Sequence, residues 1–143
     1  MRFAPVAVLA LLVLFAGSAC SRGNASKISN DNVTTLNQVG KNLDSLLSQT
    51  AMNLKKCSST RNRAKCVNKL LSSTVDQMES GAYSVDQVAD DASGECQTDL
   101  RAVARDIRDM AKEVRTGAAT KAGQRFTEDW DLLYGGCNLK RMN

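Results

Sequence analysis

Apolar side chains recur every three or four residues along most of the chain, which is the spacing of an amphipathic helix. The clearest segment is 95–115, where one side of a helical wheel is entirely apolar: Cys96, Leu100, Val103, Ile107, Met110 and Val114. The same spacing continues from Asn30 to Leu54. No segment alternates apolar and polar residues with the period of two that a half-buried strand shows. The chain is therefore predicted to be all-α.

Polar turns and glycines divide this pattern into helices. The first helix is predicted from about Asn30 to Leu54, and the second from the turn 58–65 to Gly81, where glycine favours a helix C-cap. Gly40 inside the first helix costs about 1 kcal/mol relative to alanine unless a neighbouring helix packs closely against it.

The second half of the chain supplies the remaining helices. A capping-box pattern at 84–87, Ser-x-x-Gln, predicts a new helical start after Gly81. Ser-Gly at 93–94 predicts a bend or break, and Gly117 ends the helix that contains 95–115. The last helix is predicted at 118–134, stopped by two glycines. Helices joined by such short turns predict an antiparallel four-helix bundle with up-down-up-down topology.

Residues 1–19 have the pattern of a signal peptide. Arg2 supplies the positive charge, 4–16 form an apolar core, and 17–19 are small residues suited to cleavage. A membrane-spanning helix needs about 20 apolar residues, and this run is shorter and is interrupted by Pro5. We therefore expect the protein to be exported.

Residues 16–20, Ala-Gly-Ser-Ala-Cys, resemble a bacterial lipobox, in which the cysteine is lipidated and becomes the first residue of the mature chain. The segment departs from that pattern at Gly17, where leucine is usual. The resemblance implies a lipid anchor on Cys20, and it explains why an exported chain has five cysteines, an odd number. Residues 20–30 are polar and are predicted to form a flexible tether, which leaves 31–143 as the folded domain.

The other four cysteines allow three pairings. Cys57 and Cys66 flank the first predicted turn, while Cys96 and Cys137 lie almost equally far from Gly117 on either side. Antiparallel helices folded about Gly117 would bring the second pair together, because a disulfide needs Cα atoms about 5.5 Å apart. We predict Cys57–Cys66 and Cys96–Cys137 as structural disulfides of a protein in an oxidising compartment.

The composition excludes the commonest catalytic arrangements. The chain has no histidine, which removes the commonest general base and metal ligand and excludes a Ser–His or Cys–His nucleophile. No glycine-rich phosphate loop is present. The carboxylates of the segment 95–115 share one arc of the helical wheel, and we expect them to face solvent: Asp99, Asp106, Asp109 and Glu113. We expect neither an enzyme nor a metal or cofactor site.

A further arc of the segment 95–115 carries five cations, which we call the ridge: Arg101, Arg105, Arg108, Lys112 and Arg115. The ridge is either the ordinary flank of a bundle helix, neutralised by nearby carboxylates, or a binding site for an anionic partner. The stretch 55–69 has six basic and no acidic residues. Its Arg61 and Arg63 are predicted at the same end of the bundle as Gly117, where they would extend the ridge.

These features predict an exported helical-bundle lipoprotein that acts as a non-catalytic binding or accessory protein at a bacterial cell envelope. Its expected partner is a protein with an acidic surface, together with the membrane that holds the lipid anchor. A formal charge of +4 and the lack of an exposed aromatic platform indicate no nucleic-acid partner. The alternative is a soluble secreted inhibitor or immunity-type protein that blocks an enzyme; sequons at Asn24 and Asn32 would suit secretion from a eukaryote.

Overall fold

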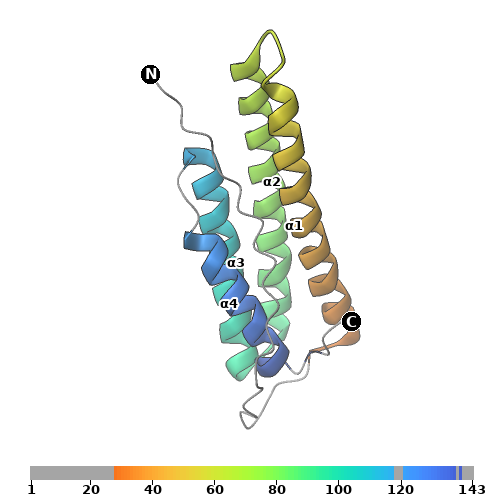
Figure 1. Ribbon diagram of the computed structural model, residues 1–143. Coiled ribbons are helices and arrows are strands. Elements are labelled where there is room, and N and C mark those ends of the chain that lie inside the picture. The colour runs from red at the N-terminus through yellow and green to blue at the C-terminus, as the bar shows by residue number, and fades with distance from the viewer. Residues whose placement is uncertain (1–27, 118–120, 138, 140–143) are drawn as a thin grey trace.

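A computed structural model describes residues 28–117, 121–137 and 139. They form four helices and no strand: α1 (Asn30–Cys57), α2 (Arg63–Asp91), α3 (Gly94–Thr116) and α4 (Lys121–Gly136). Figure 1 shows that each helix packs beside the next and runs in the opposite direction. The predicted all-helical bundle is confirmed. The predicted signal peptide, most of the tether and Cys20 lie outside the described residues.

The hydrophobic core is centred on α3. Five of the six apolar side chains predicted from the periodicity of 95–115 are buried there, with Leu100, Val103 and Ile107 completely enclosed, and Val114 is partly buried against them. α2 contributes Met78 and Val85, both also fully buried. α3 packs against α2 on one side and against α4 on the other, whereas α1 packs mainly against α2. The core is therefore a layer between α2 and α3 that α1 and α4 cover.

The predicted break in the second helix is wrong, because α2 continues from Arg63 through Gly81 to Asp91. Gly81 faces α1, and a Cβ atom built on it would lie 3.7 Å from Val39 Cγ1. Ser84 does not cap a new helix; its hydroxyl donates to the Ser80 carbonyl within α2. Burial of the apolar residues on both sides of Gly81 favours one continuous helix and outweighs the weak local stop signal.

The other helix ends follow the glycine signals more closely. α2 ends at Asp91, just before the predicted break at Ser93 and Gly94, and Gly117 takes the left-handed conformation, with φ of 69°, after α3. α4 runs two residues beyond the predicted stop, to Gly136. The extension buries Gly136 and positions Cys137 against α3, where its sulfur forms a disulfide.

Both predicted disulfides are present. The Cα atoms are 5.6 Å apart in Cys57–Cys66 and 4.6 Å apart in Cys96–Cys137. Closing these loops contributes roughly 2.7 and 3.9 kcal/mol to stability on the chain-entropy estimate. Two structural disulfides indicate an oxidising, non-cytoplasmic compartment. None of the described helices combines the length and apolar character needed to cross a membrane.

Two glycines in the middle of helices provide a test of this packing. Gly40 faces α4, and a Cβ atom on it would lie only 2.9 Å from Trp130 Cζ2, whereas the nearest atom to a Cβ on Gly81 is at 3.7 Å. We expect Gly81→Ala to stabilise the protein by about 1 kcal/mol through helix propensity. Gly40→Ala should lower stability, because overpacking costs about 1–3 kcal/mol. Urea unfolding of both variants measures the difference; equal stabilisation would contradict the Gly40–Trp130 contact.

Candidate binding surface

The α1–α2 hairpin extends beyond α3 and α4 at one end of the bundle (Figure 1). α2 ends at Asp91 and α3 begins at Gly94, so the two helices run antiparallel from a common end, and α3 ends at Thr116. α2 has 29 residues and α3 has 23, so the first six or so residues of α2 run past the end of α3, over about 9 Å. We call residues 48–75, which comprise this overhang and the adjoining part of the hairpin, the arm.

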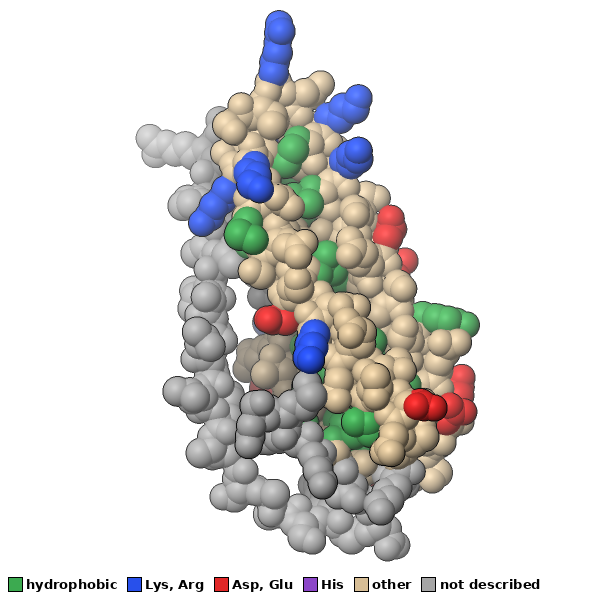
Figure 2. All heavy atoms as spheres, turned by 90° about the vertical axis from the view of Figure 1, so that its right-hand side faces the viewer, with side chains coloured by type: hydrophobic (Ala, Val, Ile, Leu, Met, Phe, Trp, Pro, Cys, Tyr) green, Lys and Arg blue, Asp and Glu red, His purple; other side chains and the backbone are tan. Residues whose placement is uncertain are grey.

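The arm carries six cations and no acidic residue: Lys55, Lys56, Arg61, Arg63, Lys65 and Lys69. All six side chains are exposed, and none forms an ion pair with another residue that the structure describes. Figure 2 shows lysine and arginine side chains gathered at this end of the molecule, with aspartate and glutamate side chains farther down. The arm is therefore a strongly electropositive projection.

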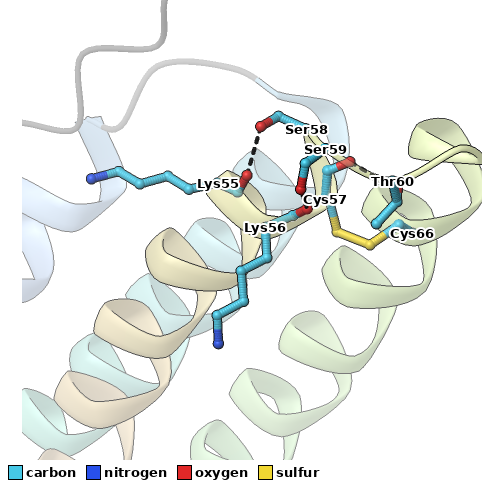
Figure 3. The surroundings of a disulfide bond; sticks show 7 residues. All are labelled: Lys55, Lys56, Cys57, Ser58, Ser59, Thr60 and Cys66. Atoms are coloured by element: carbon cyan, nitrogen blue, oxygen red, sulfur yellow. Dashed lines mark hydrogen bonds between the residues drawn. A yellow bond between two sulfur atoms is a disulfide. The ribbon is translucent and has the colours of Figure 1, made fainter.

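Local bonds rather than a core hold the tip of the arm. Cys57, which the disulfide ties to Cys66, is the only buried residue among 51–73. In the turn, the Ser58 hydroxyl donates to the Lys55 carbonyl at 2.6 Å, and the Thr60 hydroxyl donates to the Cys57 carbonyl at 2.9 Å (Figure 3). These bonds satisfy carbonyl groups that the end of α1 leaves free, and they fix the shape of the tip.

At its base the arm is fixed by a buried hydroxyl pair. The Oγ1 atoms of Thr50 and Thr74 are 2.9 Å apart between α1 and α2, and the Thr74 hydroxyl also lies 2.9 Å from the Leu70 carbonyl. Both threonines are buried. A hydrogen bond between buried groups is worth more than one in water. The Thr50–Thr74 pair therefore sets the register of the two helices at the point where the arm leaves the bundle.

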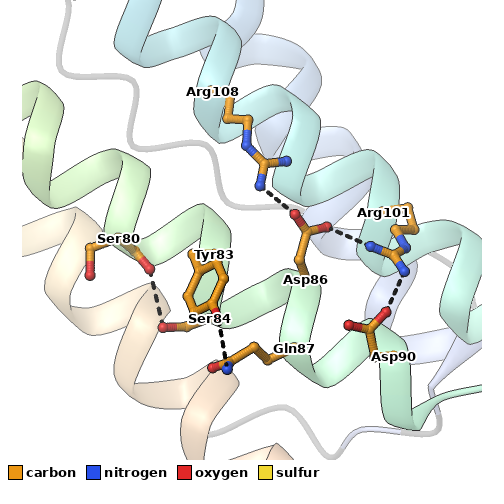
Figure 4. Close-up of polar contacts among 8 residues, drawn as sticks. All are labelled: Ser80, Tyr83, Ser84, Asp86, Gln87, Asp90, Arg101 and Arg108. Carbon is orange, nitrogen blue, oxygen red and sulfur yellow. Dashed lines mark hydrogen bonds and ion pairs between the residues drawn. The ribbon is translucent and has the colours of Figure 1, made fainter.

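The ridge lies against the acidic side of α2 (Figure 4). Arg101 and Arg108 both donate to Asp86, and Arg101 also pairs with Asp90. The hydrogen bond to Asp86 is the main reason why the pKa of Arg101 is raised. Exposed pairs of this kind stabilise a protein little, but they occupy the guanidinium groups and hold α3 in register with α2.

The other members of the ridge differ from one another. Arg115 pairs with Glu79 of α2, and Arg105 approaches Asp129 of α4 at 3.8 Å. Lys112 is exposed and forms no ion pair with another described residue. The carboxylates that neutralise the ridge come mainly from α2. The use of the ridge by a partner stays a prediction.

Asp106 does not face solvent as expected; its side chain is completely buried between α3 and α4. Its Oδ1 accepts a hydrogen bond of 3.3 Å from Arg125 Nε, while no described residue donates to its Oδ2. Burial is the main cause that raises the pKa of Asp106, hydrogen bonding to Asp129 raises it further, and Arg125 opposes the shift. Asp106 was misplaced because helical periodicity alone does not show that α4 covers this edge of α3.

The neighbouring carboxylates also attach α4 to α3. Asp109 accepts from Arg125 at 2.9 Å, and Glu113 accepts from the backbone N–H of Ala122 at 3.3 Å, in the first turn of α4. These contacts are structural: the described residues contain no group of three potential ligands arranged to hold a metal ion. The acidic arc of α3 thus attaches α4 to α3, although only Asp106 is buried and the side chain of Asp109 is still 46% exposed.

No protein-family model matches the chain, and no curated protein or solved structure is detectably similar to it. The molecule's own geometry therefore has to indicate its function. It defines a class of small, disulfide-linked helical bundle in which one helical hairpin projects as a cationic arm.

Asp106→Asn tests the buried carboxyl. A folded-state pKa above the unfolded value means that Asp106 adds stability at low pH, and that this contribution is lost as the pH rises through the folded-state pKa. The asparagine variant lacks that dependence, so its stability relative to the wild type should rise as the pH increases from about 4. Urea unfolding at several pH values gives this difference. A difference that falls with pH would show that the Arg125 pair dominates.

Proposed function

We propose that this protein is an exported, non-catalytic binding protein, lipid-anchored at a bacterial cell envelope, whose arm contacts the acidic surface of a partner protein. The observation that carries the proposal is the set of six exposed cations on the arm, with no acidic residue among them and no ion-pair partner in the described structure. Complementary charge steers association and favours the correct partner. The disulfide keeps this charged surface preorganised, which reduces the entropy lost on binding.

The arm is a better candidate contact than the ridge. A partner that bound Arg101 or Arg108 would have to displace Asp86, to which both already donate. A partner that bound the arm would break no ion pair between the arm cations and the described residues. Because desolvation and lost ion pairs are subtracted from any binding energy, the arm cations offer the larger net gain.

The expected anchor directs the arm away from its own membrane. α1 has 28 residues, so its ends are about 42 Å apart. The ten residues from Cys20 to Asn30 reach at most about 35 Å when fully extended. If α1 stood perpendicular to the membrane with the arm touching it, the start of α1 would lie about 42 Å from that membrane, which is farther than residues 20–30 can reach. This geometry favours a protein partner over lipid headgroups as the ligand of the arm.

A soluble secreted inhibitor is the alternative function. The rigid cationic tip, closed by Cys57–Cys66 and by the hydroxyl bonds of the turn 58–60, would suit insertion into the acidic cleft of an enzyme. The two functions use the same surface, and they differ in whether the mature chain carries lipid.

Neutralising the arm tests the binding proposal. We expect Lys55→Gln, Lys65→Gln and Lys69→Gln together to reduce recovery of envelope partner proteins by about tenfold or more. Each of these positive charges attracts an acidic partner to the arm and so raises both the association rate and the affinity. The matched control neutralises Arg101, Arg105 and Arg108 in the same way. Quantitative mass spectrometry of pull-downs at low and high salt measures recovery. If only the control loses its partners, the ridge is the binding site and the arm is not.

The modification of Cys20 separates the lipoprotein from the secreted alternative. We expect the N-terminal peptide of the mature protein to begin at Cys20 and to carry a diacylglycerol group, and Cys20→Ser to move the protein from the membrane fraction to the soluble fraction. Mass spectrometry of each fraction shows the modification. A mature chain with a free Cys20 or Ser21 terminus would favour the soluble inhibitor.

A further inference from the structure

The two disulfides differ in their access to solvent. Cys96 and Cys137 are 0% and 1% exposed, in the core where the end of α4 meets α3. In the arm, Cys57 is 2% exposed, whereas Cys66 is partly exposed in the first turn of α2. Figure 3 shows the bond between Cys57 and Cys66 joining the ends of the two helices. Of these four cysteines, solvent reaches Cys66 most readily.

The charges around the arm disulfide are all positive. Lys56 and Lys65 each directly precede one of its cysteines, and two arginines lie in the segment between them. The nearest carboxylate along α2 belongs to Asp76, ten residues after Cys66, which corresponds to about 15 Å of helix. That distance exceeds the Debye length of about 8 Å at physiological ionic strength. An anion that approaches this disulfide is therefore attracted, and no nearby carboxylate of α2 cancels the attraction.

The other disulfide lies beside carboxylates. The side chains of Asp99 and Glu95 lie against Gly136, which directly precedes Cys137. An anion approaching there meets two groups of its own charge, and both sulfurs belong to buried residues. The two disulfides thus differ in the sign of the charge beside them as well as in access, and the molecule contains its own control for a reaction with an anion.

We propose that Cys57–Cys66 is an exchange-reactive disulfide, at which a small thiol that carries a carboxylate forms a mixed disulfide with Cys66. Exchange begins when a thiolate attacks one sulfur of a disulfide, so that negative charge has to reach this sulfur. The cations of the arm raise the local concentration of such an anion. This reaction goes beyond the proposed binding function, because it places the closure of the arm under redox control.

The exchange takes two balanced steps. The attacking thiolate forms a new S–S bond with Cys66 Sγ, and the electron pair of the broken bond leaves on Cys57 Sγ, which takes a proton from water. A second thiolate then attacks the sulfur of the first thiol and releases Cys66, which is protonated in turn. The arm disulfide gains two electrons, and two molecules of thiol are oxidised to their own disulfide.

Reduction is expected to loosen the arm while the rest of the bundle stays folded. Cys57 is the only buried residue among 51–73, so no apolar core replaces the lost bond there. The six arm cations repel one another once the covalent link is gone. The core between α2 and α3 and the Cys96–Cys137 bond do not depend on this link.

Two small thiols of opposite charge test the electrostatic attraction. The full-length mature protein, with any free thiol blocked beforehand, is reacted with mercaptopropionate or with cysteamine. Each rate constant is expressed per thiolate and divided by that of the same thiol with the uncharged disulfide of mercaptoethanol, which removes differences in intrinsic reactivity. We expect a preference of about tenfold or more for mercaptopropionate at low ionic strength, and its loss in high salt.

A matched pair of variants locates the charges responsible. Lys56→Gln with Lys65→Gln neutralises the two cations beside the arm cysteines, whereas Lys41→Gln with Arg105→Gln removes the same net charge outside the arm. We expect the first pair to reduce the preference for mercaptopropionate by about threefold or more, and the second pair to change it by less than about twofold. Thermal unfolding of the oxidised variants checks their fold.

Peptide mapping identifies the sulfur that is attacked. Trypsin separates the two arm cysteines, because Cys57 lies in the peptide 57–61 and Cys66 in the peptide 66–69. After a brief reaction and alkylation, we expect mercaptopropionate on Cys66 and the alkyl group on Cys57, while Cys96 and Cys137 stay paired. Amide hydrogen exchange of the reduced protein should become faster in 55–69 and stay unchanged in α3.

Three outcomes would overturn the exchange proposal. The first is an equal normalised rate for the two thiols, or a preference that high salt leaves unchanged. The second is an adduct found mainly on Cys57, and the third is reduction of Cys96–Cys137 as fast as that of the arm disulfide. None of these results depends on a partner protein, so the proposed binding function stands or falls separately.

Discussion

Burial of the apolar side of α3 against α2 is the constraint on which the rest of the molecule depends. Leu100, Val103 and Ile107 are completely enclosed there, and their burial is the largest favourable contribution that a helix of this composition can make. α3 has 23 residues and α2 has 29. Since α3 begins at the end of the bundle where α2 ends, the six extra residues of α2 run past the other end of α3 and form part of the arm.

The disulfides reinforce the places that this core does not reach. Cys57–Cys66 closes the arm, where no other residue of 51–73 is buried, and Cys96–Cys137 holds the end of α4 on α3 at the opposite end. A chain with 4% aromatic residues has a lean core, and covalent links compensate by restricting the unfolded ensemble. At the tip the link also holds together a surface whose like charges repel each other.

Local patterns predicted the helices and the disulfides, because both depend on short-range spacing. They failed where a distant segment decides the outcome. Gly81 carries a stop signal in the sequence, but burial of Met78 and Ala82 on either side of it keeps α2 continuous. Asp106 lies on a polar arc, but α4 covers it. The arm was not predicted, because its length depends on the register of α3 against α2, which the buried core between these two helices defines.

The distribution of charge follows from this register. The sequence holds two basic stretches and one acidic stretch, and the acidic stretch on α2 faces only one of them. The arginines of α3 therefore find partners inside the molecule, in Asp86, Asp90 and Glu79. The cations of the arm face solvent, with no carboxylate of their own segment to neutralise them. Because Asp86, Asp90 and Glu79 pair with α3 and no described carboxylate pairs with the arm, the positive charge of the arm is not neutralised within the described residues.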